Sequence, residues 1–271
     1  MAIVRSTPCS LTSARSWGRS YDVIVRKSVA EIEIMREAGR VSARALRLVG
    51  DAVRPGITTQ ELDDLAESVI REAGGIPAFK GYHGFPKTLC TSVNSQVVHG
   101  IPSKAVTLVE GDILSVDVGA IVDGYYGDNA RTFAVGAISS EARRLLDVTA
   151  ASLDAGIAEC VIGKHLFDIG HAVQQVAEAA GFGVVREYVG HGIGRSMHED
   201  PNVPNYGLAG KGLNLEEGMV LAIEPMINLG GKEVESLPDG WTVVTQDGSL
   251  SAHFEHSVAI TKDGPLVLTV D

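Results

Sequence analysis

The chain has 271 residues, of which 45% are hydrophobic and 21% are charged. This length fits one large domain or two ordinary ones, and the composition excludes a collagen-like protein, a disulfide-stapled miniprotein and an intrinsically disordered chain. The formal net charge of −11 repels phosphate backbones and anionic lipid heads. We therefore expect a folded globular protein that has no direct contact with nucleic acid or membranes.

Cysteine usage predicts a reducing compartment. Cys9, Cys90 and Cys160 are far apart in the sequence and show no C-x-x-C spacing, unlike a disulfide framework or a zinc site. The longest apolar runs, such as Met219 to Ile223, are far shorter than the roughly 18 residues typical of a membrane span. We expect a cytoplasmic protein.

The start of the chain has a composition of its own. The first twenty residues carry three arginines and no acidic residue. We expect residues 1–24 to form a flexible extension and residues 25–271 to form a single domain. A disordered tail, an organellar transit peptide and a wrongly assigned start site remain open for the extension.

Two capping boxes predict a pair of helices. Ser28 with Glu31 and Thr58 with Glu61 have the required spacing, and apolar residues follow each at helical intervals. The helices are expected to end at Pro55-Gly56 and at Gly74-Gly75, which are typical helix stops. The next helix pair is expected from Ser140-Glu141 onward and over residues 167–180.

Short β-like segments follow each helix pair. The repeated order predicts two similar halves, over residues 28–136 and 137–267, within one α+β domain, because no linker separates them. The Asp123-Gly124 dipeptide between alternating segments predicts a two-residue hairpin.

The hairpin register brings two carboxylates together. A two-residue loop pairs Val122 with Tyr125, which places Asp117 and Asp128 on one face as diagonal neighbours, about 7 to 8 Å apart at the backbone. These carboxylates repel each other unless they are protonated, exposed or neutralised by a cation. On the hairpin alone, two aspartates on a wet sheet face remain the simpler interpretation.

The second half adds further metal-binding side chains. His191 lies among glycines, and Glu224 and Glu255 lie in apolar, β-like contexts. Four carboxylates and one imidazole suit Mn, Fe(II), Co or Zn better than a soft, thiolate-seeking ion. The set is compatible with two ions that share bridging oxygens.

Eight short motifs follow one another along the chain. They are Gly81-Tyr-His-Gly-Phe-Pro-Lys87, Val97-Val-His-Gly-Ile-Pro102, Asp117 with Gly127-Asp128, Gly190-His-Gly-Ile-Gly-Arg195, Met197-His-Glu-Asp-Pro201, Ile223-Glu-Pro-Met226, Asp239-Gly-Trp241 and Phe254-Glu-His256. With these motifs in this order, the chain resembles the type I methionine aminopeptidases, the short bacterial and organellar form.

The resemblance implies a pita-bread fold, in which two pseudo-symmetric halves close around a curved antiparallel sheet. It implies that residues 25–271 are a catalytic metallopeptidase domain holding two divalent ions, Co, Mn, Fe(II) or Zn. The implied ligands are Asp117, Asp128, His191, Glu224 and Glu255, with Asp128 and Glu255 bridging.

The implied activity is removal of the N-terminal methionine from nascent proteins and peptides with a small second residue. A water or hydroxide shared by the metals attacks the first peptide bond. Glu224 accepts and returns the proton, His198 donates to the carbonyl oxygen, and His99 contacts the scissile nitrogen or the leaving group.

The resemblance also implies an apolar pocket for the methionine side chain. Its expected lining is Phe79, Tyr82, Phe85, Cys90, Met197 and Trp241. Phe79 and Met197 depart from the family pattern, in which a small residue or cysteine and an aromatic residue are common at these positions. The other histidines are expected to be structural: His83 and His256 near the site, and His165 and His171 inside a helix.

Two alternatives use the same fold. A proline-specific peptidase would share all five ligands but usually carries an additional N-terminal domain, and a catalytically inactive binding protein would tend to lose ligands. We expect a monomer that acts on nascent polypeptides and N-terminal methionine peptides, and the family raises ribosome association as a further expectation.

Overall fold

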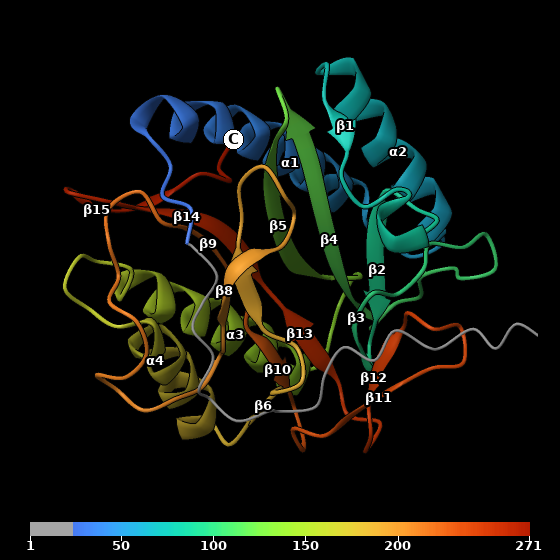
Figure 1. The fold of residues 1–271 in the computed structure, drawn as a ribbon. Helices are drawn as coiled ribbons and strands as arrows, with labels where there is room; N and C mark the ends of the chain where they lie inside the picture. Colours follow the sequence, from blue (N-terminus) through green and yellow to red (C-terminus); the bar gives the residue numbers. More distant parts are fainter. Residues whose placement is uncertain (1–23) are drawn as a thin grey trace, which may run out of the picture.

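The computed structural model describes residues 24–271 (Figure 1), so the predicted N-terminal extension lies outside the described residues, apart from Ile24. The helical elements of this part of the chain are α1 (Val29–Ala52), α2 (Thr59–Glu72), the short η1 (Tyr82–Gly84), α3 (Ser140–Ala158) and α4 (Leu166–Ala179). Over residues 24–271, no helix is both long and apolar enough to cross a membrane.

Both predicted capping boxes are confirmed. The Ser28 and Thr58 side chains accept hydrogen bonds from the backbone amides of Glu31 and Glu61, whose carboxylates bond back to the cap backbones. His165 corrects one expectation, because it lies at the N-cap of α4 and not inside a helix. Its backbone amide donates to Asp168 Oδ2 at 2.7 Å, which ends the preceding loop and starts the helix.

The strands are short except for one long hairpin. Their bounds are β1 (Ile76–Pro77), β2 (Leu89–Val93), β3 (Gln96–Val98), β4 (Ile113–Val122), β5 (Tyr125–Ala134), β6 (Gly183–Val184), β7 (Gly190–Gly192), β8 (Glu199–Val203), β9 (Val220–Ile223), β10 (Met226–Asn228), β11 (Val234–Ser236), β12 (Val243–Thr245), β13 (Ser251–His253), β14 (Glu255–Thr261) and β15 (Gly264–Val267).

One large antiparallel sheet organises residues 24–271. Its order is β1-β4-β5-β14-β9-β7-β8, with β2 beside β4 and β15 beside β14. Two smaller sheets, β13-β10-β6 and β11-β12-β3, complete the β structure of this region. The predicted hairpin register is confirmed, because Val122 pairs with Tyr125 and Asp117 pairs with Ala130.

Each helix pair covers a different part of the large sheet. The apolar faces of α1 and α2 pack on Leu114, Val116 and Val118, which point away from the two aspartates. The pair α3 and α4 packs on apolar side chains of β9 and β14, Leu221 and Val258 among them. Figure 1 shows the first pair at the top of the view and the second at the lower left. The helices thus cover the sheet from outside and leave its concave side for the aspartates.

Candidate metal centre

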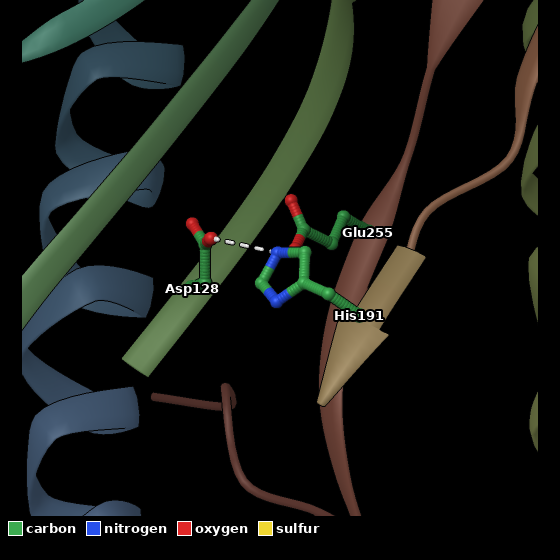
Figure 2. Close-up of side chains that lie close together, drawn as sticks. All are labelled: Asp128, His191 and Glu255. Atoms are coloured by element: carbon green, nitrogen blue, oxygen red, sulfur yellow. Dashed lines mark ion pairs between the residues drawn. The ribbon is translucent and has the colours of Figure 1, made fainter. Parts of the chain in front are cut away.

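Three strands of the large sheet bring a histidine and two carboxylates together. Asp128 comes from β5, Glu255 from β14 and His191 from β7. All three side chains are buried, and one ligand atom of each lies within 4.8 Å of the others. Figure 2 shows the three groups facing one another, with a dashed line between His191 and Asp128. His191 Nε2 lies 3.9 Å from Asp128 Oδ2.

Hydrogen bonds fix the backbone around these residues. The Asp128 amide donates to Ser257 Oγ at 3.1 Å, and that hydroxyl donates to the Asp128 carbonyl at 2.9 Å. His191 Nδ1 lies 2.9 Å from the Gly192 carbonyl. A ring nitrogen that bonds a backbone carbonyl leaves the other nitrogen free as a metal ligand, which is the usual arrangement of ligating histidines. Nε2 of His191 is therefore the atom that faces the carboxylates.

The remaining predicted ligands border this cluster. The carboxyl groups of Asp117 and Asp128 lie near enough to influence each other's pKa. Glu224 follows β9 directly, and its Oε1 lies 3.5 Å from His191 Nε2. The Asn205 side-chain amide donates to the Glu224 carbonyl at 3.0 Å and holds the turn after β9. The structure therefore brings all five predicted ligands into one cluster.

Several oxygens of this cluster lack a hydrogen-bond partner. Asp117 Oδ1, Asp128 Oδ1 and Glu255 Oε1 are buried and unpaired. An unpaired buried carboxylate oxygen is costly unless a proton or a cation compensates it. Carboxylate oxygens with one imidazole nitrogen form a donor set for hard or borderline divalent ions. The side chains present fit divalent metals.

The pKa values of these groups in the absence of a metal ion are those of a site that lacks a cation. Burial raises the pKa of Asp117 to about 7, and burial with repulsion from neighbouring carboxylates raises the pKa values of Asp128 and Glu255 well above the usual range. The pKa of Glu224 is also raised well above its usual range, first by burial. Burial lowers the pKa of His191 to about 3. The metal-free site therefore holds protons on carboxyl groups at neutral pH, with a neutral imidazole beside them.

Of the two predicted auxiliary histidines, His198 borders the cluster and His99 packs against aromatic rings. The His198 and His191 rings lie with centroids 4.3 Å apart, and His198 Nδ1 lies 2.8 Å from the Tyr82 hydroxyl. His99 has a φ of 60°, and its ring meets Trp241 edge-on at 6.3 Å. Burial lowers the pKa of His99 to about 4 and lowers that of His198. Both rings are neutral at pH 7 and available as hydrogen-bonding groups.

The predicted pocket residues share one apolar cluster next to these histidines. Four of the predicted pocket residues are buried members of this cluster: Phe79, Phe85, Cys90 and Met197. The other two, Tyr82 and Trp241, are partly buried and pack against the cluster. Phe85 and Trp241 meet edge-on with ring centroids 5.1 Å apart. Gly119 makes room for Phe79 and Met197, since a Cβ atom there would lie 2.9 Å from side-chain atoms of each.

The remaining histidines serve local structure. His256 Nδ1 lies 2.8 Å from Thr269 Oγ1, and His171 Nδ1 lies 3.2 Å from the Gly207 carbonyl. His83 packs edge-on to the Tyr82 ring at 4.4 Å. None of these three rings is among the groups that face the carboxylate cluster in the described structure.

Sequence reasoning missed His253. Its side chain is buried, its Nε2 has no hydrogen-bond partner, and this atom lies 3.7 Å from Glu224 Oε2. Burial lowers the pKa of His253 to about 3. No local pattern singles out His253, because it ends β13 in one of the small sheets, whereas Glu255 begins β14 in the large sheet.

Comparisons with known proteins identify the family. The model of metallopeptidase family M24 matches residues 33–262. A methionine aminopeptidase of Clostridium acetobutylicum is 55% identical over 248 residues, which cover 92% of this chain and 99% of that protein. Methionine aminopeptidase 1 of Bacillus subtilis is 51% identical, with 91% and 99% covered. The chain belongs to the methionine aminopeptidases of family M24.

Solved structures of the family confirm the fold. The methionine aminopeptidase of Thermotoga maritima matches with a TM-score of 0.91 and 46% identity, over 92% of this chain and all of that chain. The predicted α+β pita-bread fold is therefore correct, and family membership makes the chain a metal-dependent peptidase. A prolidase of Pyrococcus furiosus shares the fold at a TM-score of 0.71, but at 22% identity this likeness extends to the fold alone.

Proposed function

We propose that the chain removes the N-terminal methionine from peptides and nascent proteins, using two divalent ions held by Asp117, Asp128, His191, Glu224 and Glu255. The relatives' names supply the substrate. The observation that carries the metal site is the set of buried, unpaired carboxylate oxygens around His191 Nε2. Neither a proline-specific peptidase nor an inactive binding protein is favoured by the relatives that match at about half identity.

The arrangement of the predicted ligands supports two carboxylates that are shared by two ions. Asp128 lies near Asp117, whose charge raises the pKa of Asp128, and Asp128 Oδ2 lies 3.9 Å from His191 Nε2. Glu255 lies on β14, which pairs with both β5 and β9 in the middle of the sheet. Together with the family resemblance, these central positions suit Asp128 and Glu255 as the carboxylates that two bound ions would share. The ions, when bound, lower the pKa of a coordinated water from 15.7 to about 7 and polarise the scissile carbonyl.

Glu224 is the proposed proton carrier. Its two oxygens face His191 Nε2 at 3.5 Å and His253 Nε2 at 3.7 Å. In the metal-free site, burial raises the pKa of Glu224 well above its usual range. Glu224 accepts the proton of the attacking water and passes it to the leaving amine, which is general acid–base catalysis by one group.

His198 is the proposed donor to the carbonyl oxygen of the scissile bond. When the Tyr82 hydroxyl donates to Nδ1, the proton of the neutral ring is on Nε2. That nitrogen then donates to the oxygen as negative charge develops on it. His99, neutral at pH 7 and held edge-on by Trp241, contacts the scissile nitrogen or the leaving group.

The apolar cluster is the proposed binding pocket for methionine. A methionine side chain is flexible and polarisable and forms favourable sulfur contacts with ring edges. Phe79, Tyr82, Phe85 and Trp241 supply the aromatic rings, and Cys90 and Met197 supply polarisable sulfur. We propose that this pocket sets the specificity for methionine, and that a small second residue is preferred.

The proposal also covers the metal ions, the cellular compartment, the substrates and the domain bounds. The ions are Co, Mn, Fe(II) or Zn, since the donor set suits each of them. We propose that the enzyme is a cytoplasmic monomer whose substrates are nascent chains and free N-terminal methionine peptides, and that it acts near the ribosome. Residues 25–271 form the single catalytic domain, with pseudo-halves over 28–136 and 137–267.

Hydrolysis by metal-titrated enzyme tests this function. Protein stripped with a chelator and titrated separately with Mn, Fe(II), Co and Zn should cleave a Met-Ala-Ser peptide only after metal addition, and should leave an Ala-Pro peptide intact. Cleavage of only the Ala-Pro peptide would replace the proposal with a proline-specific activity. Metal binding without any hydrolysis would support the inactive binding protein.

A further inference from the structure

The loop that carries Met197 and His198 is tied to the chain just before α1. Lys27 Nζ lies 2.6 Å from Glu199 Oε2, and the two side chains are only 3% and 14% exposed. The Lys27 amide also donates to the Gly218 carbonyl at 2.7 Å, and the Gly218 amide donates to the Ile260 carbonyl on β14. Lys27 is therefore fixed to the central sheet and reaches from it to the loop.

The Glu199 carboxylate links Lys27 to the backbone of the loop. Its second carboxylate oxygen, Oε1, accepts the Ser196 amide at 3.1 Å. The Gly194 amide donates to the Ser196 carbonyl at 3.2 Å, and the Tyr126 amide donates to the Gly194 carbonyl at 2.9 Å. One carboxylate thus binds both the ammonium group of Lys27 and the turn that precedes Met197 and His198.

Burial distinguishes this ion pair from the other lysine and arginine pairs between residues 24 and 271. In those pairs the cationic side chain is at least 36% exposed, and exposed pairs contribute little to stability. A buried pair gains little net stability over an apolar replacement, because both charges lose their hydration. Its position under the loop therefore points to a role in geometry.

We infer that Lys27 is a positioning residue for catalysis: through Glu199 it holds loop 194–199 so that His198 faces the metal cluster. The inference depends on the role proposed above for His198. It predicts that His198 shifts when the pair is broken, even though His191, Asp128 and Glu255 stay on their strands. Breaking the pair should therefore lower the catalytic rate but leave the metal affinity unchanged.

Gly194 offers a second way to disturb the pair. A Cβ atom on Gly194 would lie 2.5 Å from Lys27 Cε and 2.6 Å from Glu199 Oε1. Both contacts are to the far ends of flexible side chains, and Gly194 is not among the residues of positive φ. Gly194→Ala should therefore displace the pair with little cost in stability and without deleting either charge.

The test compares Lys27→Met, Glu199→Gln, their double variant and Gly194→Ala with a Lys27→Arg variant that keeps the charge. Arg26→Met is the matched control, because Arg26 pairs with Glu216 at the same 2.6 Å distance but the two side chains are 57% and 53% exposed. The readouts are kcat and KM on a Met-Ala-Ser peptide, Mn affinity by calorimetry, and hydrogen exchange of residues 194–199.

The inference predicts that Lys27→Met lowers kcat by about 10- to 100-fold, the loss typical of a displaced catalytic group, while Mn affinity is kept. Exchange in residues 194–199 should become faster in Lys27→Met and in Gly194→Ala. Lys27→Arg should recover most of kcat, Arg26→Met should match wild type, and the double variant should be no worse than the poorer single variant.

Wild-type kcat and wild-type exchange in Gly194→Ala would overturn the inference, as would an equal loss of kcat in Arg26→Met. If Lys27→Met does not fold, Gly194→Ala decides the outcome. An inactive wild-type enzyme would instead contradict the proposed function, and the exchange comparison would still show whether the pair holds the loop.

Discussion

The hydrogen bond between Tyr82 and His198 gives the sharpest test of the catalytic geometry. The Tyr82 hydroxyl lies 2.8 Å from His198 Nδ1, and the Tyr82 ring packs against the apolar pocket. Tyr82→Phe removes only the hydroxyl and keeps the ring. The ring of His198 then loses the bond that fixes its tautomer and orientation.

The expected loss follows from the value of one hydrogen bond. A neutral hydrogen bond contributes about 0.5–1.5 kcal/mol net, so Tyr82→Phe should lower kcat by about 2- to 12-fold. Removal of the donor itself by His198→Ala should lower kcat by about 10²–10³, as for an oxyanion donor. If Tyr82 acts only through His198, the double variant should be no slower than His198→Ala.

Steady-state kinetics on a Met-Ala-Ser peptide measures these losses. KM and Mn affinity should change little in Tyr82→Phe, because the ring and the five proposed metal ligands remain. A Tyr82→Phe loss that simply multiplies the His198→Ala loss would refute this reasoning. It would show that Tyr82 acts on the substrate independently of His198.

Four further predictions follow from the cluster and the pocket. Asp128→Asn should abolish metal-dependent hydrolysis and keep the circular dichroism spectrum of the fold; full activity would reject the shared carboxylate. Metal binding at pH 7 should release protons, since Asp117 has a pKa of about 7 and three other carboxyl groups have pKa values raised well above normal. His191, with a pKa of about 3, is already neutral and releases none. Calorimetry in buffers of different ionisation enthalpy measures the proton release, and a binding enthalpy that does not depend on the buffer would contradict it. Met197→Ala should raise KM for Met-Ala-Ser more than it lowers kcat, because it enlarges the pocket; an unchanged KM would place Met197 outside the pocket. His253→Leu should weaken metal binding by about 10- to 100-fold, as expected for loss of a group that borders a metal ligand, and wild-type affinity in a metal titration would assign His253 to packing.

Local signals in the sequence were sufficient to predict the helix starts and the central hairpin. Ser28, Thr58 and the Asp123-Gly124 turn each act over a few residues, so their effects can be read without knowledge of the rest of the fold. The hairpin register then placed Asp117 and Asp128 on one face, and the structure confirms that register. Residues whose roles depend only on nearby chain were therefore predictable.

Contacts across the sheet were not predictable in the same way. His191 and Glu224 meet because β7 pairs with β9, and Glu255 joins them because β14 pairs with both β9 and β5. These pairings join segments far apart in the sequence, and the family resemblance, not spacing, supplied the five ligands as a set. His253 and Lys27 belong to neither a local motif nor that set, so only the folded structure shows what they contact.

Anomalous diffraction from crystals of the Mn-loaded protein tests the central claim most directly. The account predicts two manganese peaks, roughly 3.5 to 4 Å apart as in known two-metal sites, with Asp128 and Glu255 in contact with both ions. Manganese peaks located elsewhere, or no peak among Asp117, Asp128, His191, Glu224 and Glu255, would contradict the account.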